Sequence, residues 1–430
     1  MGYNFFNIKE VSRVFNGKLQ EFRASLGDAI CKGKNITFAD NDITYVLKLQ
    51  YERLKKKGLE MEYDIYSRSY EDKNKGFISG SNWQDAHYVS TVCFSPFGVK
   101  RKVKKDGAVR FSDNRKSVLY ETITDVVSGA HPDNDPICCP NCGAVSTIAA
   151  LQDGCSYCGT KFQMDDLFPK VTSYYFLDDA GLTKREFKTD YLRFYAGTLA
   201  GLYILGCILN GAVFLPQNLI KSIPNLIAVL LGLTLGSVVL AYILYGYFLI
   251  LRLIVRAIAS AGKMGTAGSR RSFETRMKKV SPEFSFEYFT SKALSLIKTA
   301  VFSEDERELL FYEGAGLDPK MKNIIDLNYG GALGCIGFRD EGSFVTVVTK
   351  AYFDVLYAEE NKIHAKSEVF SATFRRRTDI PVNLNFSMTG IACPACGASF
   401  DATKNRTCPY CGTKYEITTD DWALVELKYN

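Results

Sequence analysis

The stretch that decides the organisation of this chain is CPNCGAVSTIAALQDGCSYCG, residues 139–159. It contains two Cys-x-x-Cys pairs, and each pair is followed by a glycine, which permits a backbone conformation that a side chain would hinder. Each pair presents two thiolates from one tight turn, and two such turns complete the tetrahedral four-sulfur shell that zinc prefers. Because all four positions are protein ligands, none stays open for water. The motif predicts a structural metal site, a zinc ribbon.

A second copy of the motif, CPACGASFDATKNRTCPYCG, occupies residues 393–412. Iron–sulfur ligation and a redox dithiol are the competing interpretations, but Cys-x-x-Cys pairs at this spacing fit zinc best. Cys138 is an alternative to its neighbour Cys139, although the proline after Cys139, repeated after Cys393, favours Cys139. We expect two structural Zn²⁺ ions per chain, held by these ligands: Cys139, Cys142, Cys155, Cys158, Cys393, Cys396, Cys408 and Cys411.

The likeness between the two copies extends beyond the ligands. Gly-Thr-Lys and an aromatic residue follow both Cys158 and Cys411, and each copy then reaches an Asp-Asp pair. β-rich runs lie at corresponding places around each motif: residues 88–99, 118–127 and 168–176 in the first half, and 344–356, 369–375 and 422–429 in the second. We interpret the chain as a duplicated α+β domain with a zinc ribbon inserted before its last strand. The alternative is two unrelated domains with similar ribbons.

Helices are expected ahead of the strands in both halves. Apolar residues recur with a period near 3.6 in two stretches, one with Ile8, Val11, Phe15, Leu19, Phe22, Leu26 and Ile30, the other with Phe286, Phe289, Ala293, Leu296 and Ala300. These stripes are typical of helix faces that pack into a core. The expected domains are therefore residues 1–178 with a ribbon at 138–159, and residues 282–430 with a ribbon at 392–412.

Two apolar runs separate the halves. Residues 194–215 and 226–251 contain no charged side chain, and each run exceeds the length of about 18 residues that marks a transmembrane candidate. We therefore predict a two-helix transmembrane hairpin at residues 191–254 that works as an anchor; the alternative is a pair of buried core helices. Glycines spaced by four, Gly197 with Gly201 and Gly232 with Gly236, offer faces where the two helices would approach closely.

The basic residues around the runs predict the topology. Lys221 is the one charge in the connecting residues 216–225, whereas basic residues flank both outer ends of the hairpin: Lys184, Arg185, Lys188, Arg193, Arg252, Arg256 and Lys263. Loops rich in Lys and Arg stay on the cytoplasmic side. We expect a multi-pass protein of the cell membrane with both termini in the cytoplasm.

The positive charge is concentrated in one place. The net charge of the chain is +6, and the stretch from Arg256 to Lys279, within an expected basic linker at residues 255–281, carries that whole excess. Because this stretch follows the second run directly, we expect it to contact anionic lipid; a solvated, glycine-containing linker is the alternative. The candidate lipid-contact residues are Arg256, Lys263, Arg270, Arg271, Arg276, Lys278 and Lys279.

Composition excludes several other classes. Thirteen cysteines would suit a secreted disulfide scaffold, but eight lie in Cys-x-x-Cys pairs and the first residues do not resemble a signal peptide. The three histidines, His87, His131 and His364, form no catalytic pattern, and there is no phosphate loop or nucleophile elbow, so we expect no enzyme. A basic run at residues 100–105 precedes Asp106-Gly107, a hairpin-turn signal. It indicates either a solvated hairpin or a contact with an anionic surface.

From Ser281 onward the chain resembles the domain shared by the forty-four-kilodalton subunit of the mitochondrial inner-membrane translocase and its bacterial relatives. The resemblance rests on Pro282-Glu-Phe284 opening a helix, on the acidic stretch 304–306, and on the β-runs that end in residues 422–429. It implies a helical lid over a curved sheet, similar to nuclear-transport-factor-two-like domains, and proteins that sit at membranes, contact anionic lipid and dock partners. The inserted ribbon, which resembles transcription-factor-IIB-type ribbons, departs from that family pattern.

These expectations lead to two functions from different classes. The first is a non-enzymatic, membrane-anchored scaffold or adaptor that docks proteins or lipid at the cytoplasmic face, with protein transport as the role implied by the resemblance. The second is a membrane-tethered protein that binds nucleic acid or regulates its use, because zinc ribbons often contact nucleic acid. Near-neutral domains argue against nucleic acid, and Arg375-Arg376-Arg377 is the strongest argument for it. The expected partners are the bilayer and an unidentified protein; a homo-oligomer is compatible with the sequence.

Overall fold

A computed structural model describes residues 15–68, 82–84, 88–126, 136–178, 184–210, 223–379 and 391–429, apart from residues 140, 141, 143, 148, 149, 152, 153, 160–168, 283, 307, 308, 310, 361, 394, 397, 398, 401–406 and 415–420. The chain divides into two compact units. The first combines Met1–Asp179 with Lys263–Asn430, and the second is Ala180–Gly262. The two α+β halves, expected as separate domains, thus belong to one unit.

The first half contributes an antiparallel sheet with the strand order β1-β3-β4-β7. Its strands are β1 (Leu59–Ser67), β3 (Tyr88–Lys105), β4 (Ala108–Val126) and β7 (Lys170–Asp178), and the short β2 (Asn82–Gln84) pairs with β3. Asp106 and Gly107 connect β3 to β4 with φ angles of 53° and 75°. Positive φ at both central residues is typical of the Asp-Gly hairpin turn, so that prediction is confirmed.

The second half contributes a four-stranded antiparallel sheet with the order β8-β9-β10-β13. Its strands are β8 (Ile324–Asp340), β9 (Phe344–Ala358), β10 (Ile363–Arg377) and β13 (Ala423–Tyr429). In both sheets the spatial order follows the chain order, and the Cys-x-x-Cys motifs lie between the third and fourth strands. The chain is therefore an α+β protein with the same strand order in both halves.

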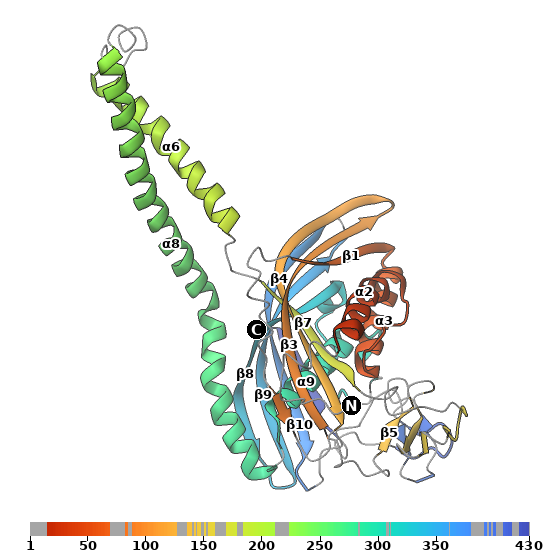
Figure 1. Cartoon of the computed structure of the whole chain (residues 1–430). Coiled ribbons are helices and arrows are strands. Elements are labelled where there is room, and N and C mark those ends of the chain that lie inside the picture. Colours follow the sequence, from red (N-terminus) through yellow and green to blue (C-terminus); the bar gives the residue numbers. More distant parts are fainter. Residues whose placement is uncertain are drawn as a thin grey trace. The chain divides into compact units, whose positions relative to one another are not determined.

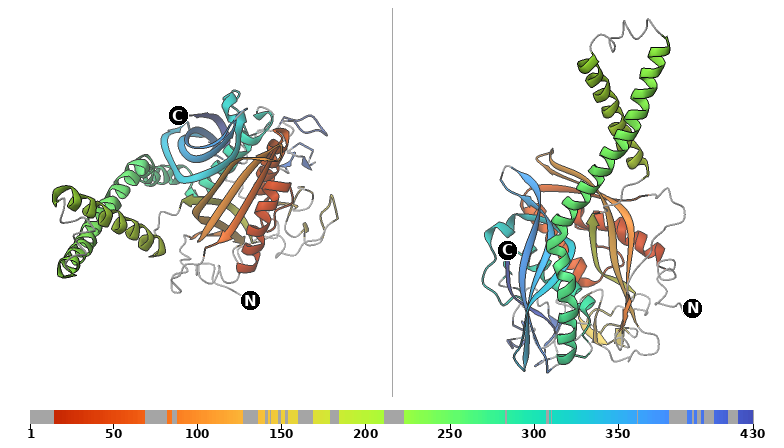
Figure 2. Two further views of the ribbon diagram at one scale, coloured as in Figure 1. Left: turned by 90° about the horizontal axis from the view of Figure 1, so that it is seen from above. Right: turned by 90° about the vertical axis from the view of Figure 1, so that its left-hand side faces the viewer.

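Helices pack beside both sheets. They are α2 (Asn16–Lys32) and α3 (Asn41–Lys56) in the first half, and α9 (Phe286–Phe302) with the one-turn η3 (Pro319–Asn323) in the second. The predicted apolar stripe is buried in α2 from Leu19 to Ile30 and throughout α9, which confirms both core faces. Ile8 and Val11 lie outside the described residues. Figure 1 shows α2 and α3 (red) next to each other, and Figure 2 shows the two sheets standing side by side.

The cores of the two halves interlock, which explains why they form one unit. Val46 of α3 belongs to the hydrophobic cluster of the second half, whereas Ile325 and Leu356 of the second sheet belong to the cluster of the first half. Arg53 of α3 is buried and donates to the backbone carbonyls of Ser303 (2.9 Å) and Met321 (3.2 Å). Because burial dominates its environment, the pKa of Arg53 is lowered to about 10.

A buried lysine joins three parts of the chain. The Nζ of Lys292 on α9 lies 3.2 Å from a carboxylate oxygen of Asp42 on α3 and 3.2 Å from one of Asp421, just before β13. Tyr288 donates its hydroxyl to the same Asp421 oxygen at 2.8 Å. Burial lowers the pKa of Lys292, but the two carboxylates outweigh burial and hold it well above its usual value. The ammonium group therefore stays charged inside the core.

A buried arginine makes a second connection between the sheets. Arg101 on β3 donates from Nη1 to Asp326 on β8 (2.6 Å) and from Nη2 to Asp113 on β4 (2.5 Å). Gln50 on α3 donates to the other oxygen of Asp326 at 3.1 Å. Burial opposes the charged form of Arg101, but the two carboxylates raise its pKa above the usual range. Part of the basic run at 100–105 is therefore structural.

The second unit contains α6 (Lys184–Asn210) and most of α8 (Ile223–Val280). Within the described residues, Ile227–Leu251 of α8 is the one helical segment long and apolar enough to cross a membrane, and most of it is exposed. The first predicted run begins inside α6, but residues 211–215 of that run lie outside the described part of the chain. Length and composition therefore support one membrane-spanning helix.

The glycine pairs do not provide the predicted close approach of α6 and α8. A Cβ atom added at Gly197, Gly201 or Gly232 would meet nothing within 4 Å, and only Gly236 has a neighbour across the pair, Leu202 at 3.5 Å. The two helices instead contact each other through a buried Thr198 hydroxyl that lies 3.2 Å from the carbonyl of Ser237.

Candidate metal centres

The first cysteine group has the geometry of a zinc site. The sulfur atoms of Cys139 and Cys158 are 3.7 Å apart, and those of Cys142 and Cys155 are also 3.7 Å apart. All four sulfurs lie within 4.8 Å of one another. A tetrahedral site with Zn–S bonds of about 2.3 Å places its sulfurs about 3.8 Å apart. The four residues therefore fit one zinc ion, and the sequence assigned the same four.

The second group repeats this geometry. Sulfur atoms are 3.5 Å apart between Cys393 and Cys411, and 3.6 Å apart between Cys396 and Cys408. These four also lie within 4.8 Å of one another. The pairing is the same in both groups: the first cysteine approaches the last, and the second approaches the third. Two closed four-sulfur sites result, each suited to hold zinc for a structural purpose.

The backbone of the second turn in each motif explains its glycine. Gly159 has a φ of 69° and donates its N–H to the carbonyl of Cys155 at 2.7 Å. Gly412 has a φ of 73° and donates to the carbonyl of Cys408 at 2.9 Å. A side chain at either position would be strained in this left-handed conformation. The corresponding glycines of the first turns, residues 143 and 397, lie outside the described residues.

Each motif begins at a short hairpin. β5 (Pro136–Cys138) pairs with β6 (Val145–Thr147), and β11 (Ile391–Ala392) pairs with β12 (Ser399–Phe400). The N–H of Cys139 donates to the carbonyl of Ala144 at 2.7 Å, which closes the first turn over the ligands. Cys138 is the last residue of β5, and the group of four close sulfurs contains Cys139. The structure thus favours Cys139 over its neighbour.

Each site combines buried and exposed ligands. Cys139, Cys155, Cys393 and Cys408 are buried, whereas Cys142, Cys396 and Cys411 are exposed. Hydrogen bonds with Thr413 lower the pKa of the Cys411 thiol to about 6, which favours the thiolate form that binds metal. A metal at either site would therefore lie close to the surface, with its buried ligands tied to the protein.

Each of the two cysteine motifs has an exposed tyrosine at the same position. Tyr157 and Tyr410 occupy the position before the last ligand of each motif, with 55% and 73% of their surface exposed. Neither tyrosine stood out in the sequence, where aromatic residues are common. Their equivalence becomes visible once the four ligands of each site are aligned.

The stretch expected as a basic linker, residues 255–281, is helical as far as Val280 at the end of α8. Phe273 and Met277 are buried in the core of the second half, and Arg270 pairs with both Glu274 (2.9 Å) and Glu287 (2.5 Å). The remaining described side chains among the candidate lipid contacts are exposed: Arg271, Arg276, Lys278 and Lys279. Arg256 and Lys263 belong to the same helix. The sequence did not distinguish Arg270 from the other six because its partner Glu287 lies on α9.

The other basic clusters are engaged within the protein. Arg375 pairs with Glu313 (2.7 Å), Arg377 pairs with Asp379 (2.5 Å), and Arg376 is buried near the Trp422 ring. On the first sheet, Lys102 and Lys104 both contact Glu62, their neighbour on β1. These five cationic side chains are thus in contact with acidic neighbours or with the core.

Comparisons with known proteins identified no relative of this chain. No family model matches the chain, and neither a curated protein nor a solved structure matches it.

Proposed function

We propose that this protein is a membrane-anchored zinc-ribbon scaffold or adaptor that docks proteins or lipid at the cytoplasmic face of the membrane. One observation carries the proposal. α8 is a single helix that contains the apolar segment Ile227–Leu251 and ends with Phe273 and Met277 buried in the α+β unit. The anchor and the folded unit therefore share a helix instead of being joined by an irregular linker.

The second part of the proposal is that the anchor is a hairpin of two helices. We propose that α6 supplies the first span of the hairpin, because Thr198 and Ser237 join the two helices and its outer face carries apolar side chains such as Ile204 and Ile208. Both halves of the α+β unit would then lie on the same side. The basic flanks of the hairpin support the cytoplasmic side.

Internal duplication is part of the same proposal. Both sheets have the same strand order, both carry a four-cysteine motif between the third and fourth strands, and α2 and α9 precede them as helices of equal length, 17 residues each. Two unrelated domains would share these features only by coincidence. A duplicated unit whose two copies interlock places two metal motifs on one compact unit, which suits a scaffold.

In this proposal the protein is a non-enzymatic scaffold and the metal has a structural role. Four thiolates saturate each site, so a bound zinc would have no position for water or substrate. The residues that would hold it are the eight cysteines already named, and the chemistry that it supplies is the crosslinking of two turns. A role in protein transport is the narrower reading that the sequence resemblance implies.

The test compares the full chain with a variant of the apolar segment. The parent should stay in the membrane fraction after alkaline carbonate washing, and detergent extraction should recover a bound partner protein. The double variant Leu235→Lys, Val239→Lys places two charges among exposed apolar residues near the middle of the span, at a cost of about 2.5–3.5 kcal/mol each, and should be retained in the membrane less than the parent. Recovery of the parent in the soluble fraction would refute the anchor.

A further inference from the structure

The last strand of each half begins with the same backbone contacts. In β7, the N–H of Val171 donates to Phe38 (2.9 Å) and its carbonyl accepts from Asp40 (3.0 Å). In β13, Leu424 donates to Phe311 (2.7 Å) and accepts from Glu313 (2.9 Å). Both contacts are isolated parallel bridges. The two strands are therefore equivalent from their second residue onward.

A bulge follows the bridge in both strands. The register of β7 on β4 shifts after Val171, and the register of β13 on β10 shifts after Leu424. Thr172 and Val425 are the extra residues, so both strands bend at the same place. Phe176 is the fifth residue after Val171, and Tyr429 is the fifth residue after Leu424. Phe176 and Tyr429 therefore occupy equivalent positions.

Beyond the bulge, the outer edge of β7 is covered by a strand of the other half. Asn328 of β8 accepts the N–H of Phe176 at 3.0 Å and donates its amide to the carbonyl of Phe176 at 2.6 Å. Tyr175 and Tyr329 pack edge to face beside this contact, with ring centroids 5.0 Å apart. One side-chain amide thus satisfies both backbone groups at the edge.

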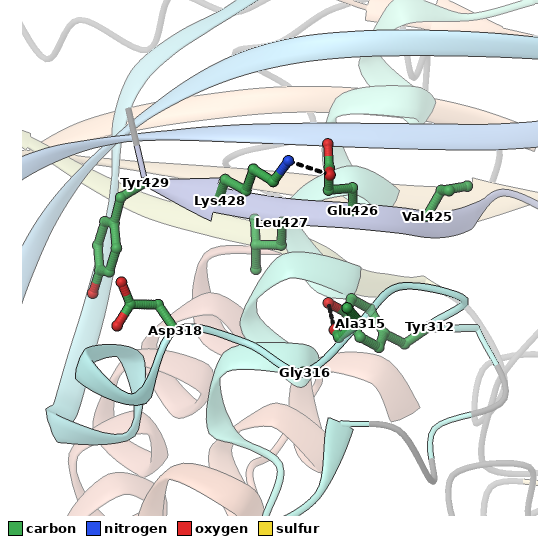
Figure 3. A pocket seen from close by; sticks show the side chains of 9 residues that line it. All are labelled: Tyr312, Ala315, Gly316, Asp318, Val425, Glu426, Leu427, Lys428 and Tyr429. Carbon is green, nitrogen blue, oxygen red and sulfur yellow. Dashed lines mark hydrogen bonds and ion pairs between the residues drawn. The ribbon is translucent and has the colours of Figure 1, made fainter.

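The equivalent edge of β13 borders a cavity instead. Within the described residues, β13 has β10 on one side and only the bridge at Leu424 on the other. The segment that makes the bridge then diverges, and a cavity of about 290 Å³ lies between it and Val425–Tyr429. Figure 3 shows Leu427 pointing into this space, with Tyr312 and Ala315 on the opposite wall and Asp318 near Tyr429.

The diverging segment is held in place by its own hydrogen bonds. Tyr312 donates its hydroxyl to the carbonyl of Ala315 at 2.5 Å, and Glu306 accepts the N–H of Leu317 at 2.7 Å. Gly314 approaches β13 so closely that an added Cβ would lie 2.6 Å from the carbonyl of Val425. The cavity is therefore a slot with a fixed wall and a strand edge as its other wall.

We propose that this slot docks an extended segment of a partner protein, which lies along Val425–Tyr429 and offers a side-chain amide to the backbone of Tyr429. At the equivalent point of the first half, the edge of β7 already receives the side-chain amide of Asn328 from β8, with no backbone ladder between these two described strands. Addition of a strand to a sheet edge is an established mode of peptide recognition. The inference rests on the proposed docking function and assigns its protein-binding surface.

The probe is a synthetic peptide with the sequence of β8 from Ile324 to Gly334, with appended lysines for solubility, added to the full-length chain in detergent. Binding should be saturable and should slow amide hydrogen exchange in residues 425–429. The matched peptide with Asn328→Ala should bind about tenfold more weakly, because two backbone hydrogen bonds are lost. Equal binding of the two peptides, or no protection of 425–429, would overturn the proposal.

A substitution in the protein completes the test. Ala315→Trp places a bulky side chain on an exposed wall of the slot and should abolish peptide binding, whereas Glu341→Trp in the exposed turn between β8 and β9 should not. Binding that survives Ala315→Trp would contradict the assignment. The experiment needs neither a membrane nor a native partner, so its failure leaves the membrane-anchor proposal to its own test.

Discussion

At the scale of single residues, two kinds of side-chain cluster organise this protein. The eight cysteines bring sulfurs together at the separation of a tetrahedral metal site, and they come from motifs that are local in sequence. Lys292 and Arg101 instead join carboxylates from elements far apart in the chain. The first kind could be read from spacing. The second could not, because nothing in the sequence indicates that Asp42 and Asp421 share one lysine.

Loss of one ligand should remove one zinc. The parent should contain two zinc ions per chain, and Cys155→Ser should contain one, because three thiolates bind far more weakly than four. Cys335→Ser, outside both groups, should keep both ions. Elemental analysis measures the ratio, and X-ray absorption should give Zn–S distances of about 2.3 Å. Fewer than two zinc ions in the parent, or an iron–sulfur absorbance, would contradict the assignment.

Lys292→Met should destabilise the fold by about 3–5 kcal/mol, since it leaves two carboxylates in the core without their cation. Lys55→Met, at an exposed position of α3, is the matched control. The pKa of Lys292 is raised in the folded state, so its contribution is fully present below the unfolded lysine pKa of about 10.4 and is lost only above it.

Denaturant unfolding therefore should give the same deficit for Lys292→Met anywhere between about pH 6 and 9. A deficit that disappears as the pH rises through this window would show that the lysine is neutral in the fold. A deficit no larger than that of Lys55→Met would show that the buried pair contributes nothing.

At the scale of elements, α8 changes the interpretation of the basic stretch. Twenty residues separate Leu251, where the apolar segment ends, from Arg271, which corresponds to about 30 Å of helix. Charges on lipid head groups are screened beyond about 8 Å at physiological salt. Arg256, about 8 Å of helix after Leu251, lies within this range, and Lys263, about 18 Å after it, is still nearer to the apolar segment than the four exposed residues from Arg271 to Lys279.

The contributions of the two groups of basic residues to lipid binding can be measured separately. Arg256→Gln with Lys263→Gln should weaken the preference of the reconstituted full chain for anionic lipid more than Gln substitution of Arg271, Arg276, Lys278 and Lys279 together. Each basic residue near the surface contributes about 1 kcal/mol, and added salt should reduce this preference. Native mass spectrometry of retained lipid, in discs of graded anionic content, measures the effect. Equal retention by both variants and the parent would mean that the stretch serves topology and packing alone.

The strands show how far local patterns reach. The three strands expected in each half exist, and their bounds extend the predicted runs, as in β3 and β10. β1 and β8 were not expected. β8 contains Gly330, Gly331, Gly334 and Gly337, which interrupt the alternation that marks a strand. β1 does alternate, with Leu59 and Met61 buried, but the charged residues on its other face concealed it.

At the scale of the whole molecule, the sequence predicted the parts better than their assembly. The metal motifs, three strands of each half and the apolar segment follow from local spacing. The interlocking of the two halves depends on Arg53 and Gln50 reaching backbone and carboxylate groups more than 250 residues away, and such contacts leave no periodic signal. The equivalence of β7 and β13, and with it the slot beside β13, likewise emerged only from hydrogen bonds.

The central claim is that both halves form one unit on the cytoplasmic side of a membrane hairpin. Sealed membrane vesicles of known orientation test it, with a membrane-impermeant maleimide and site-by-site readout by mass spectrometry. Lys55→Cys and Lys320→Cys, exposed in the first and second halves, should both be labelled from the cytoplasmic side only. Lys221→Cys, between the two apolar runs, should be labelled from the opposite side only. Labelling of Lys221→Cys from the cytoplasmic side, or of the two halves from different sides, would contradict the account.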